Sequence, residues 1–541
     1  MAQVSESREA TAKRGVLATG FPSATEAGME VLRAGGNATD AAVAAAWALA
    51  VCEPGASGLG GSTILLIHPS AGRTVVIDGH SCAPAAVSKA TVSRSQQKKG
   101  YRACTVPTTV ATLAFAQARH GVLPLARVME PAICLAEDGY PVTRLQRHQQ
   151  GWCLVDLSAQ PAARRLFLKD GKPFQTGDIF RQPELAATLR RLARVGAEDF
   201  YHGQIARDIV DDMARNGGLL AQGDLASSPS PTEDEPVAIP YRDYQVLSTA
   251  PPAGGTQVLL ALSILAQFPP GDLSGEVDDW YEIMAEVTHA VFQDRDHLAA
   301  HPSGLTPSFY DWLFSNEHMK EITESVRWPC GDRTARPVRE EPGETTHLCA
   351  ADAQGNIVSL TQSIQSVLGA KVANGKLGFL YNNYLCTSPR RAHPYRLQGR
   401  CIPRSNAAPT LVLRSDPSCP QRPGNRQAGR RRPFLALGAA GSRRIASAVL
   451  QVISGVVDRG LPLVQAVGFP RVHAALGRKV HVEKPAATRS LLRRLGKRFR
   501  SLQVRSARGF FMGAVQAIQL SEDGSFVGAA DPRRDGTAAV W

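Results

Sequence analysis

Hydrophobic residues along this chain follow two patterns. Some segments have the spacing of a helix, and others have the short apolar runs of an extended strand. Apolar residues at helical spacing, often after a capping residue, predict helices at 24–34, 38–51, 109–139, 183–195, 203–216, 257–267, 278–300, 445–457 and 486–495. Short apolar runs bounded by turn residues predict strands at 63–68, 73–78, 237–248, 348–352, 357–364, 378–385, 408–414, 433–437, 512–520 and 526–529. No stretch repeats another, so the pattern does not indicate a repeat protein.

The most informative stretch is Glu-Thr-Thr-His at 344–347, between a polar loop and a predicted pair of strands. The loop at 336–343 contains two prolines and a glycine, which oppose regular structure and suggest an accessible linker. The strands 348–352 and 357–364 flank the turn-type sequence Ala-Gln-Gly-Asn. A hydroxyl residue at the start of a strand, behind a cleavable linker, is typical of an N-terminal nucleophile. A threonine-rich strand entry has the same local pattern, and the local sequence leaves both interpretations open.

Two glycine-rich loops suggest different kinds of chemistry. The loop at 53–62 precedes a strand and lacks the Lys-Ser/Thr ending of a phosphate-binding P-loop, so nucleotide binding is not expected. The sequence Gly-Ala-Ala-Gly-Ser at 438–442 joins a predicted strand to a predicted helix. Free backbone N–H groups in such a loop suit an anion or a developing oxyanion, although a plain tight turn fits the same residues.

Composition excludes some classes of function but does not identify one. Hydrophobic residues make up 43% of the 541 residues and charged residues 20%, as in a soluble globular protein. Much of the net charge of +13 comes from basic clusters at 414–432 and 489–508. Both clusters lack the zinc-finger spacing and the interleaved aromatic residues of nucleic-acid-binding proteins. We interpret them as solvated surface and expect no nucleic-acid partner.

Cysteine spacing and hydropathy exclude further classes. The ten cysteines contain no CxxC pair and no repeated spacing, which argues against a zinc site and against a disulfide framework. We expect neither a metal nor a cofactor. Residues 1–14 lack the apolar core of a secretory signal, and no run has the length of a membrane span. A cytoplasmic location without membrane attachment is therefore expected.

Nine short stretches along the chain match one known protein family in order. They are 34–46 (AGGNATDAAVAAA), 53–62, 131–141, 181–186 with 188–189, 200–203, 251–256, 345–347, 438–445 and 531–533. Each stretch is weak alone, but nine in sequence order are a strong signal. Together they resemble the γ-glutamyltranspeptidase family of N-terminal-nucleophile hydrolases over nearly the whole chain.

The resemblance implies an α/β fold, namely a four-layer αββα sandwich of the N-terminal-nucleophile hydrolase type. It also implies that the precursor cuts itself between Glu344 and Thr345 into a large subunit, 1–344, and a small subunit, 345–541, interlocked in one domain. The Thr345 hydroxyl would attack the preceding carbonyl, and hydrolysis of the resulting ester would free an α-amine. Because an α-amine titrates near a pH of about 8, Thr345 can supply both nucleophile and base.

Residue by residue, the resemblance assigns the reaction machinery. Thr345 is the nucleophile, and Ser363 stands where the family has a supporting hydroxyl residue. The backbone amides of Gly441 and Ser442 fall at the oxyanion hole of the family. His347 is interpreted as a packing or hydrogen-bonding residue, because the mechanism needs no further base.

Three substrate-binding positions depart strongly from the family pattern. His80 stands where the family has an Arg that binds the α-carboxylate of the glutamyl group, and His cannot reproduce that bidentate geometry. Tyr384 and Thr387 stand where the family holds the α-amino group with a Gln or Glu and an Asp. The loss of two charge-assisted contacts costs roughly 3 to 6 kcal/mol unless other groups replace them.

Two further departures are milder. Gln365 stands where the family has an Asn, and Ser405-Asn406 stands where it has a pair of Ser residues. The loop 387–403 is rich in arginine and offers another partner for an anionic acyl group, although exposed loop arginines are also commonly just solvated.

The sequence therefore predicts a self-processing amide hydrolase or acyltransferase. It would pass a γ-glutamyl or related acyl group from a small-molecule amide to water or an amine, through an acyl-enzyme on Thr345. Two alternatives stay open. One is an acylase of the same family that acts on a non-glutamyl amide, and the other is an unprocessed relative that serves as a binding or scaffold protein.

Overall fold

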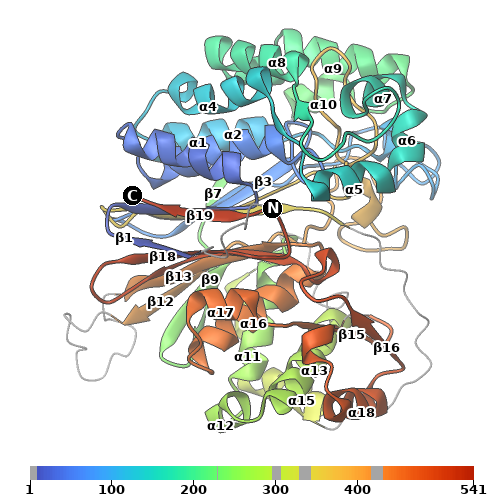
Figure 1. Ribbon diagram of the computed structural model, residues 1–541. Coiled ribbons are helices and arrows are strands. Elements are labelled where there is room, and N and C mark those ends of the chain that lie inside the picture. The colour runs from blue at the N-terminus through green and yellow to red at the C-terminus, as the bar shows by residue number, and fades with distance from the viewer. Residues whose placement is uncertain (1–8, 228–229, 295–305, 328–342, 416–430, 475) are drawn as a thin grey trace.

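The computed structural model describes residues 9–227, 230–294, 306–327, 343–415, 431–474 and 476–541. Figure 1 shows two β-sheets packed face to face, with helices covering the outer face of each. Within the described ranges both sheets have seven strands, and every neighbouring pair in them is antiparallel. The α/β class and the four-layer αββα arrangement that the resemblance implied are confirmed.

The strand order mixes early and late parts of the chain. The first sheet runs β1 (Glu9–Ala12), β18 (Phe526–Ala530), β17 (Ala514–Leu520), β13 (Arg431–Ala440), β12 (Thr410–Ser415), β9 (Tyr244–Ser248) and β8 (Val237–Tyr241). The second sheet runs β19 (Thr537–Val540), β2 (Gly15–Thr19), β10 (Thr346–Asp352), β11 (Ile357–Ser363), β3 (Ser62–His68), β4 (Val75–Gly79) and β7 (Thr232–Asp234). Smaller sheets join β14 (Val472–Ala474), β15 (Lys479–Glu483) and β16 (Ser501–Arg505), and β5 (Tyr140–Pro141) with β6 (Ile179–Phe180).

Alternation along the strands divides the core between the layers. In β10, Cys349 and Ala351 belong to the cluster between the two sheets, which also contains Ile64 and Leu411. Leu348, on the opposite face of the same strand, packs into the cluster between the second sheet and its helices. Successive side chains of a strand point to opposite faces, so an almost wholly apolar strand is expected where both faces are covered.

One helical layer covers the second sheet (Figure 1). It contains α1 (Pro22–Arg33), α2 (Ala38–Cys52), α3 (Thr109–His120), α4 (Leu125–Asp138), α5 (Arg144–Trp152), α6 (Leu154–Ser158), α7 (Pro161–Phe167), α8 (Pro183–Val195), α9 (Gln204–Arg215) and α10 (Gln222–Ala226). Every residue of α2 is buried, and its small alanine side chains allow close packing against α1, α4 and β10. Asn37 caps this helix by accepting hydrogen bonds from the N–H groups of Thr39 and Asp40.

The other helical layer covers the first sheet. It contains α11 (Gly255–Leu265), α12 (Pro270–Ser274), α13 (Val277–Asp294), α14 (Pro307–Leu313), α15 (Asn316–Arg327), α16 (Arg444–Val457), α17 (Leu463–Gly468) and α18 (Arg489–Arg498). The central helix α16 is almost entirely buried and packs on β13 and α11. None of the described helices combines the length and the hydropathy needed to cross a bilayer.

Each sheet contains strands from both sides of residue 344, and they pair with one another. In the second sheet, β10 pairs with β2 and β11 pairs with β3, so the late hairpin is inserted between early strands. In the first sheet, β12 pairs with β9 and β18 pairs with β1. A cut at 344–345 would leave all these ladders intact, and the interlocked subunits 1–344 and 345–541 stay a prediction.

The predicted strand at 378–385 is wrong. Only isolated bridges form there, and a 3₁₀ helix, η4 (Tyr384–Thr387), follows. The amide oxygen of Asn382 accepts hydrogen bonds from the backbone N–H groups of Thr105 and Tyr384. Side chains that bond to the backbone in this way compete with a strand ladder.

Several predicted boundaries also shift. The helix at 109–139 is divided into α3 and α4 at the Gly-Val-Leu-Pro sequence 121–124, and the strand at 237–248 is divided into β8 and β9. The predicted loop 438–442 begins only at Gly441, because β13 continues to Ala440. The end of the helix predicted to reach residue 300 and most of the linker 336–343 lie outside the described residues.

Candidate active site

Thr345 lies at the entrance to β10, in the interior of the second sheet. Its side chain is buried, and its hydroxyl donates to the carbonyl oxygen of Glu344 at 2.7 Å. The Ser363 hydroxyl donates to the same carbonyl oxygen at 2.9 Å, and the two hydroxyl oxygens are 3.1 Å apart. Two hydroxyl groups therefore converge on the peptide bond at 344–345.

The pairing of β10 with β11 explains this convergence. Thr346 is opposite Gln362 in the ladder, and one step further the chain brings Thr345 opposite Ser363. The β-hairpin thus determines which hydroxyl residue accompanies the nucleophile.

Gln365 contributes to the site through its backbone. Its N–H donates to Ser363 Oγ at 2.9 Å, and its carbonyl oxygen accepts from the Glu344 N–H at 2.9 Å. The φ angle of Gln365 is 81°, a left-handed conformation that turns the chain at the end of β11. The peptide at 344–345 is therefore fixed on its N-terminal side by the same residue that orients Ser363.

The loop between β13 and α16 approaches this peptide. Gly441 has a φ angle of 121° and Ser442 one of 56°. Ser442 lies directly against Gly343, since a Cβ added to that glycine would be 2.4 Å from Ser442 Cβ. Asn406 donates from Nδ2 to Ser442 Oγ at 3.3 Å. The loop is thus next to the chain that leads into the nucleophile, and its role as an oxyanion hole stays a prediction.

Tyr384 reaches from η4 to Ser62 of β3 and Ser363 of β11. Its hydroxyl accepts a hydrogen bond from Ser62 Oγ at 2.9 Å and donates to the Ser363 carbonyl oxygen at 3.4 Å. Burial raises the pKa of Tyr384, so the phenol is neutral near pH 7. Thr387 donates its hydroxyl to the Tyr384 carbonyl oxygen at 2.9 Å. Neither side chain provides a negative charge for an α-ammonium group.

His80 lies in the loop after β4 and is 8% exposed. Its Nδ1 is 2.6 Å from Asp78 Oδ1, and its backbone N–H donates to the same oxygen at 2.8 Å. Although burial opposes ionisation, the charge of His80 and these two hydrogen bonds keep the pKa of Asp78 below its ordinary value. Among the described contacts, none joins His80 to Thr345.

The remaining predicted substrate-binding residues, Ser405 and Asn406, make different contacts. Asn406 reaches Ser442, whereas Ser405 accepts the Ala407 N–H on its own side chain at 3.1 Å and so turns back into its own loop. In the arginine-rich loop 387–403, Arg390 donates to backbone carbonyl oxygens rather than to the nucleophile region.

His347 is a packing residue, as expected. Its Nδ1 is 2.9 Å from Thr361 Oγ1, and its Nε2 is 3.3 Å from both Cys349 Sγ and Ser359 Oγ. Burial lowers the pKa of His347 to about 3, so the ring is neutral. It lies under Gly438 of β13, where a Cβ would be 2.3 Å from the ring.

Two ionisable residues at the site were missed from the sequence. Arg534 Nη1 forms an ion pair with Glu344 Oε1 at 2.7 Å, and both side chains are buried. Glu53 lies beside Thr346 under Gly20, and burial raises its pKa to about 8. Glu53 is the first residue of the loop 53–62 and Arg534 directly follows the stretch 531–533; both motifs were used for the family match, and that position was the available signal.

In the part of the chain that the structure describes, no group of three or more His, Cys, Asp or Glu side chains is arranged to hold a metal ion. The eight cysteines described there are free thiols.

One known family matches most of the chain. The family model described as Gamma-glutamyltranspeptidase matches residues 24–541. The chain is 31% identical over 548 residues to the glutathione hydrolase proenzyme of Escherichia coli (strain K12), covering 96% of this chain and 91% of that protein. It is 33% identical over 561 residues to the acylase ACY 1 proenzyme of Pseudomonas sp. (strain SE83), covering 98% and 94%.

A solved structure agrees with this match. The cephalosporin acylase from Bacillus halodurans has a TM-score of 0.86 and 28% sequence identity, with 100% of this chain and 98% of that chain covered. The relatives thus include glutathione hydrolases and acylases, and those named proenzymes imply a precursor that is processed into subunits. The family match, the relatives and the shared fold support an enzyme. The chain belongs to the γ-glutamyltranspeptidase family.

Proposed function

We propose that this protein is a self-processing N-terminal threonine hydrolase or acyltransferase that acts on a small-molecule amide. It would cut itself before Thr345 and then carry the acyl group of its substrate on that residue. The observation that supports this most directly is the convergence of the Thr345 and Ser363 hydroxyls on the carbonyl oxygen of Glu344. A nucleophile held this close to its target gains a large part of the rate enhancement from positioning alone.

In the proposed self-cleavage, Thr345 Oγ1 attacks the carbonyl carbon of Glu344 and forms a tetrahedral oxyanion. The C–N bond between the two residues breaks, the nitrogen takes up a proton, and an ester joins Glu344 to Thr345 Oγ1. Water then hydrolyses the ester, which leaves a carboxylate on Glu344 and a free α-amine on Thr345. Ser363, which contacts both reacting groups, donates to the developing oxyanion in this scheme.

In turnover, the free α-amine accepts the proton of the Thr345 hydroxyl as that hydroxyl attacks the substrate carbonyl. An α-amine with a pKa of about 8 is partly unprotonated at neutral pH and suits this role. The same proton passes to the leaving amine, and the acyl group stays on Thr345 until water or a second amine removes it. Backbone amides of Gly441 and Ser442 are the proposed oxyanion donors for this step.

For the acyl group, we favour one that lacks the charged α-amino-acid head of γ-glutamyl. Tyr384 is a neutral phenol bound to Ser62, and Thr387 is tied to the backbone of η4, so neither neutralises an ammonium group. The acylase relatives support the same choice. A γ-glutamyl donor is the second candidate, because the glutathione hydrolase proenzyme of Escherichia coli is as similar in sequence as the acylases are.

Intact-mass measurement tests the self-cleavage. The purified chain should separate into pieces that end at Glu344 and begin at Thr345, and a Thr345→Ala chain should stay whole. A wild-type chain that is folded and still whole after long incubation would refute the proposal.

Three anilides of equal chain length test the acyl group. γ-Glutamyl anilide carries both head-group charges, glutaryl anilide lacks the ammonium group, and pentanoyl anilide lacks both charges. We expect kcat/KM to be at least about tenfold higher for one of the two donors without the ammonium group, because a desolvated, unpaired ammonium costs at least one charge-assisted contact. A clear preference for γ-glutamyl anilide would refute the acylase choice and favour the second candidate.

A further inference from the structure

The residue before the nucleophile is held by a buried ion pair. The side chains of Glu344 and Arg534 are 0% and 1% exposed, and Oε1 and Nη1 are 2.7 Å apart. Breaking a buried pair leaves an uncompensated charge in a poorly solvated place, which is far more costly than losing a surface pair. The Glu344 side chain is therefore held by this charge pair, and its backbone N–H is held by the Gln365 carbonyl oxygen.

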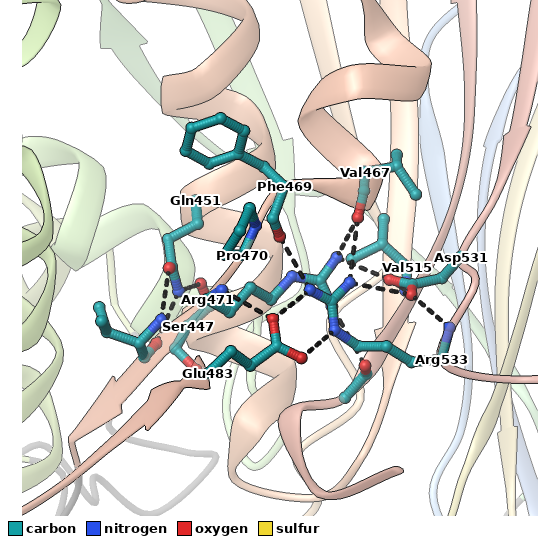
Figure 2. A network of polar contacts seen from close by, with 12 residues as sticks. Ser447, Gln451, Val467, Phe469, Pro470, Arg471, Glu483, Val515, Asp531 and Arg533 are labelled. Atoms are coloured by element: carbon teal, nitrogen blue, oxygen red, sulfur yellow. Dashed lines mark hydrogen bonds and ion pairs between the residues drawn. The ribbon is translucent and has the colours of Figure 1, made fainter. Parts of the chain in front are cut away.

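Arg534 is itself fixed by the loop that connects β18 of the first sheet to β19 of the second. Figure 2 shows the network that holds the start of this loop: Arg471 binds Asp531 at 2.6 Å, and Arg533 binds both Asp531 at 3.1 Å and Glu483 at 2.5 Å. Two guanidinium groups and two carboxylates compensate one another there. The next residue, Arg534, also lies over the ring of Phe510, 3.6 Å from its centre. The ion-pair network and the Phe510 ring thus hold the Arg534 guanidinium in place beside Glu344.

The other charges around Glu344 determine how its carboxyl titrates. Burial raises the pKa of Glu344 to about 7, against the opposing charges of Arg534 and Arg444 and a hydrogen bond from the Thr345 backbone. Glu53 and Asp535 are the further acidic groups of this cluster, with Glu53 close to Glu344, Arg534 and Asp535. Near neutral pH, Arg534 is therefore the nearest compensation for the negative charge of Glu344.

We propose that Arg534 is a positioning residue for self-cleavage, which anchors the Glu344 side chain so that the carbonyl at 344–345 stays against the Thr345 and Ser363 hydroxyls. This inference rests on the proposed function. In this role Arg534 acts through Glu344, with which it forms the ion pair. Its effect should accordingly depend on whether the side chain at position 344 carries a charge.

The test follows cleavage of the full-length chain, made by cell-free synthesis, by intact mass over time at about pH 6 and about pH 8. Arg534→Met should slow cleavage about thirtyfold or more relative to wild type at pH 8, since ionised Glu344 then lacks its partner. At pH 6 the carboxyl is protonated, because losing the cation raises its pKa further, and the deficit should shrink at least about tenfold. Arg534→Lys should retain much of the rate.

The double variant Glu344→Gln/Arg534→Met provides the decisive comparison. A neutral amide needs no cation, so this chain should cleave faster than Arg534→Met at pH 8 and show no recovery specific to low pH. Arg478→Met is the control, because it removes another largely buried cation, paired with Glu286 at 3.2 Å, without touching the cleavage site. Thermal unfolding of each change in a Thr345→Ala chain separates loss of folding from loss of cleavage.

The outcomes distinguish the two proposals. If Arg534→Met cleaves normally at both pH values, or if the double variant is as slow as Arg534→Met, the proposed role of Arg534 is overturned and the proposed function is not. A wild-type chain that does not cleave would instead overturn the proposed function.

Discussion

Replacing Ser363 by alanine should slow self-cleavage by about a hundredfold. The Ser363 hydroxyl is 2.9 Å from the Glu344 carbonyl oxygen and 3.1 Å from Thr345 Oγ1, so one side chain contacts both reacting groups. Loss of a single donor to a developing oxyanion typically raises the barrier by about 3 kcal/mol, which is roughly two orders of magnitude in rate. The Gln365 N–H also loses its acceptor, so stability should fall by about 1 to 2 kcal/mol.

The assay is the time course of intact mass for freshly synthesised chains, with unfolding measured in parallel in a Thr345→Ala background. Ser359→Ala is the matched control, because Ser359 lies on the same strand, is equally buried, and donates to the Leu437 carbonyl oxygen at 3.1 Å. That variant should lose comparable stability but cleave at nearly the wild-type rate. Cleavage of Ser363→Ala within about threefold of wild type would refute the idea that this hydroxyl stabilises the transition state.

Three further changes test other parts of the site. Thr345→Ala should give a folded chain with no cleavage and no amidase activity, as measured by intact mass and anilide hydrolysis; residual turnover would assign the nucleophile elsewhere. His80→Arg/Thr387→Asp should raise kcat/KM for γ-glutamyl anilide about tenfold or more by restoring two charges of the family pattern, and an unchanged value would place both residues outside the acyl pocket. Because burial raises the pKa of Glu53 from 4.5 to about 8, the folded state keeps a proton that the unfolded state releases, and stability falls as the pH rises through that window. Urea unfolding of Thr345→Ala chains should show this loss of stability, on the order of 1.4 kcal/mol per pH unit, and Glu53→Gln should remove it. Equal slopes of stability against pH with and without Glu53→Gln would contradict this prediction.

Thr345 and Ser363 could be proposed from the sequence through the family resemblance, and one hairpin explains why they lie together. The turn at 353–356 and the apolar runs beside it specify an antiparallel pair, and that pairing sets Thr345 against Ser363. The glycine loop after β13 was also predictable, but its start was not. Gly438 is glycine because the ring of His347 from the other sheet lies against it, not because the chain turns there.

The ion pair between Glu344 and Arg534 could not be predicted from the sequence. Arg534 is one of 61 basic residues, and nothing in its neighbourhood indicates which acid it meets. The contact depends on the loop between β18 and β19, which passes from one sheet to the other near β10 only because of the strand order β19-β2-β10. Local patterns specify strands and turns, whereas contacts of this kind require the order of strands within a sheet.

The same ion pair explains why self-cleavage should open the site. In the proposed scheme, the cut gives Glu344 a second carboxylate, on the main chain, at a place where even the first has its pKa raised to about 7 by burial. Arg534 and Arg444 are the cations that act on the Glu344 carboxyl, and the neighbouring Glu53 and Asp535 add only acidic groups. A second carboxylate at this buried place adds a further desolvation cost beside those acidic groups, which favours movement of the new chain end toward solvent while the strands on either side stay paired. The departure of Glu344 then exposes the Thr345 hydroxyl, with its new α-amine, to an acyl donor.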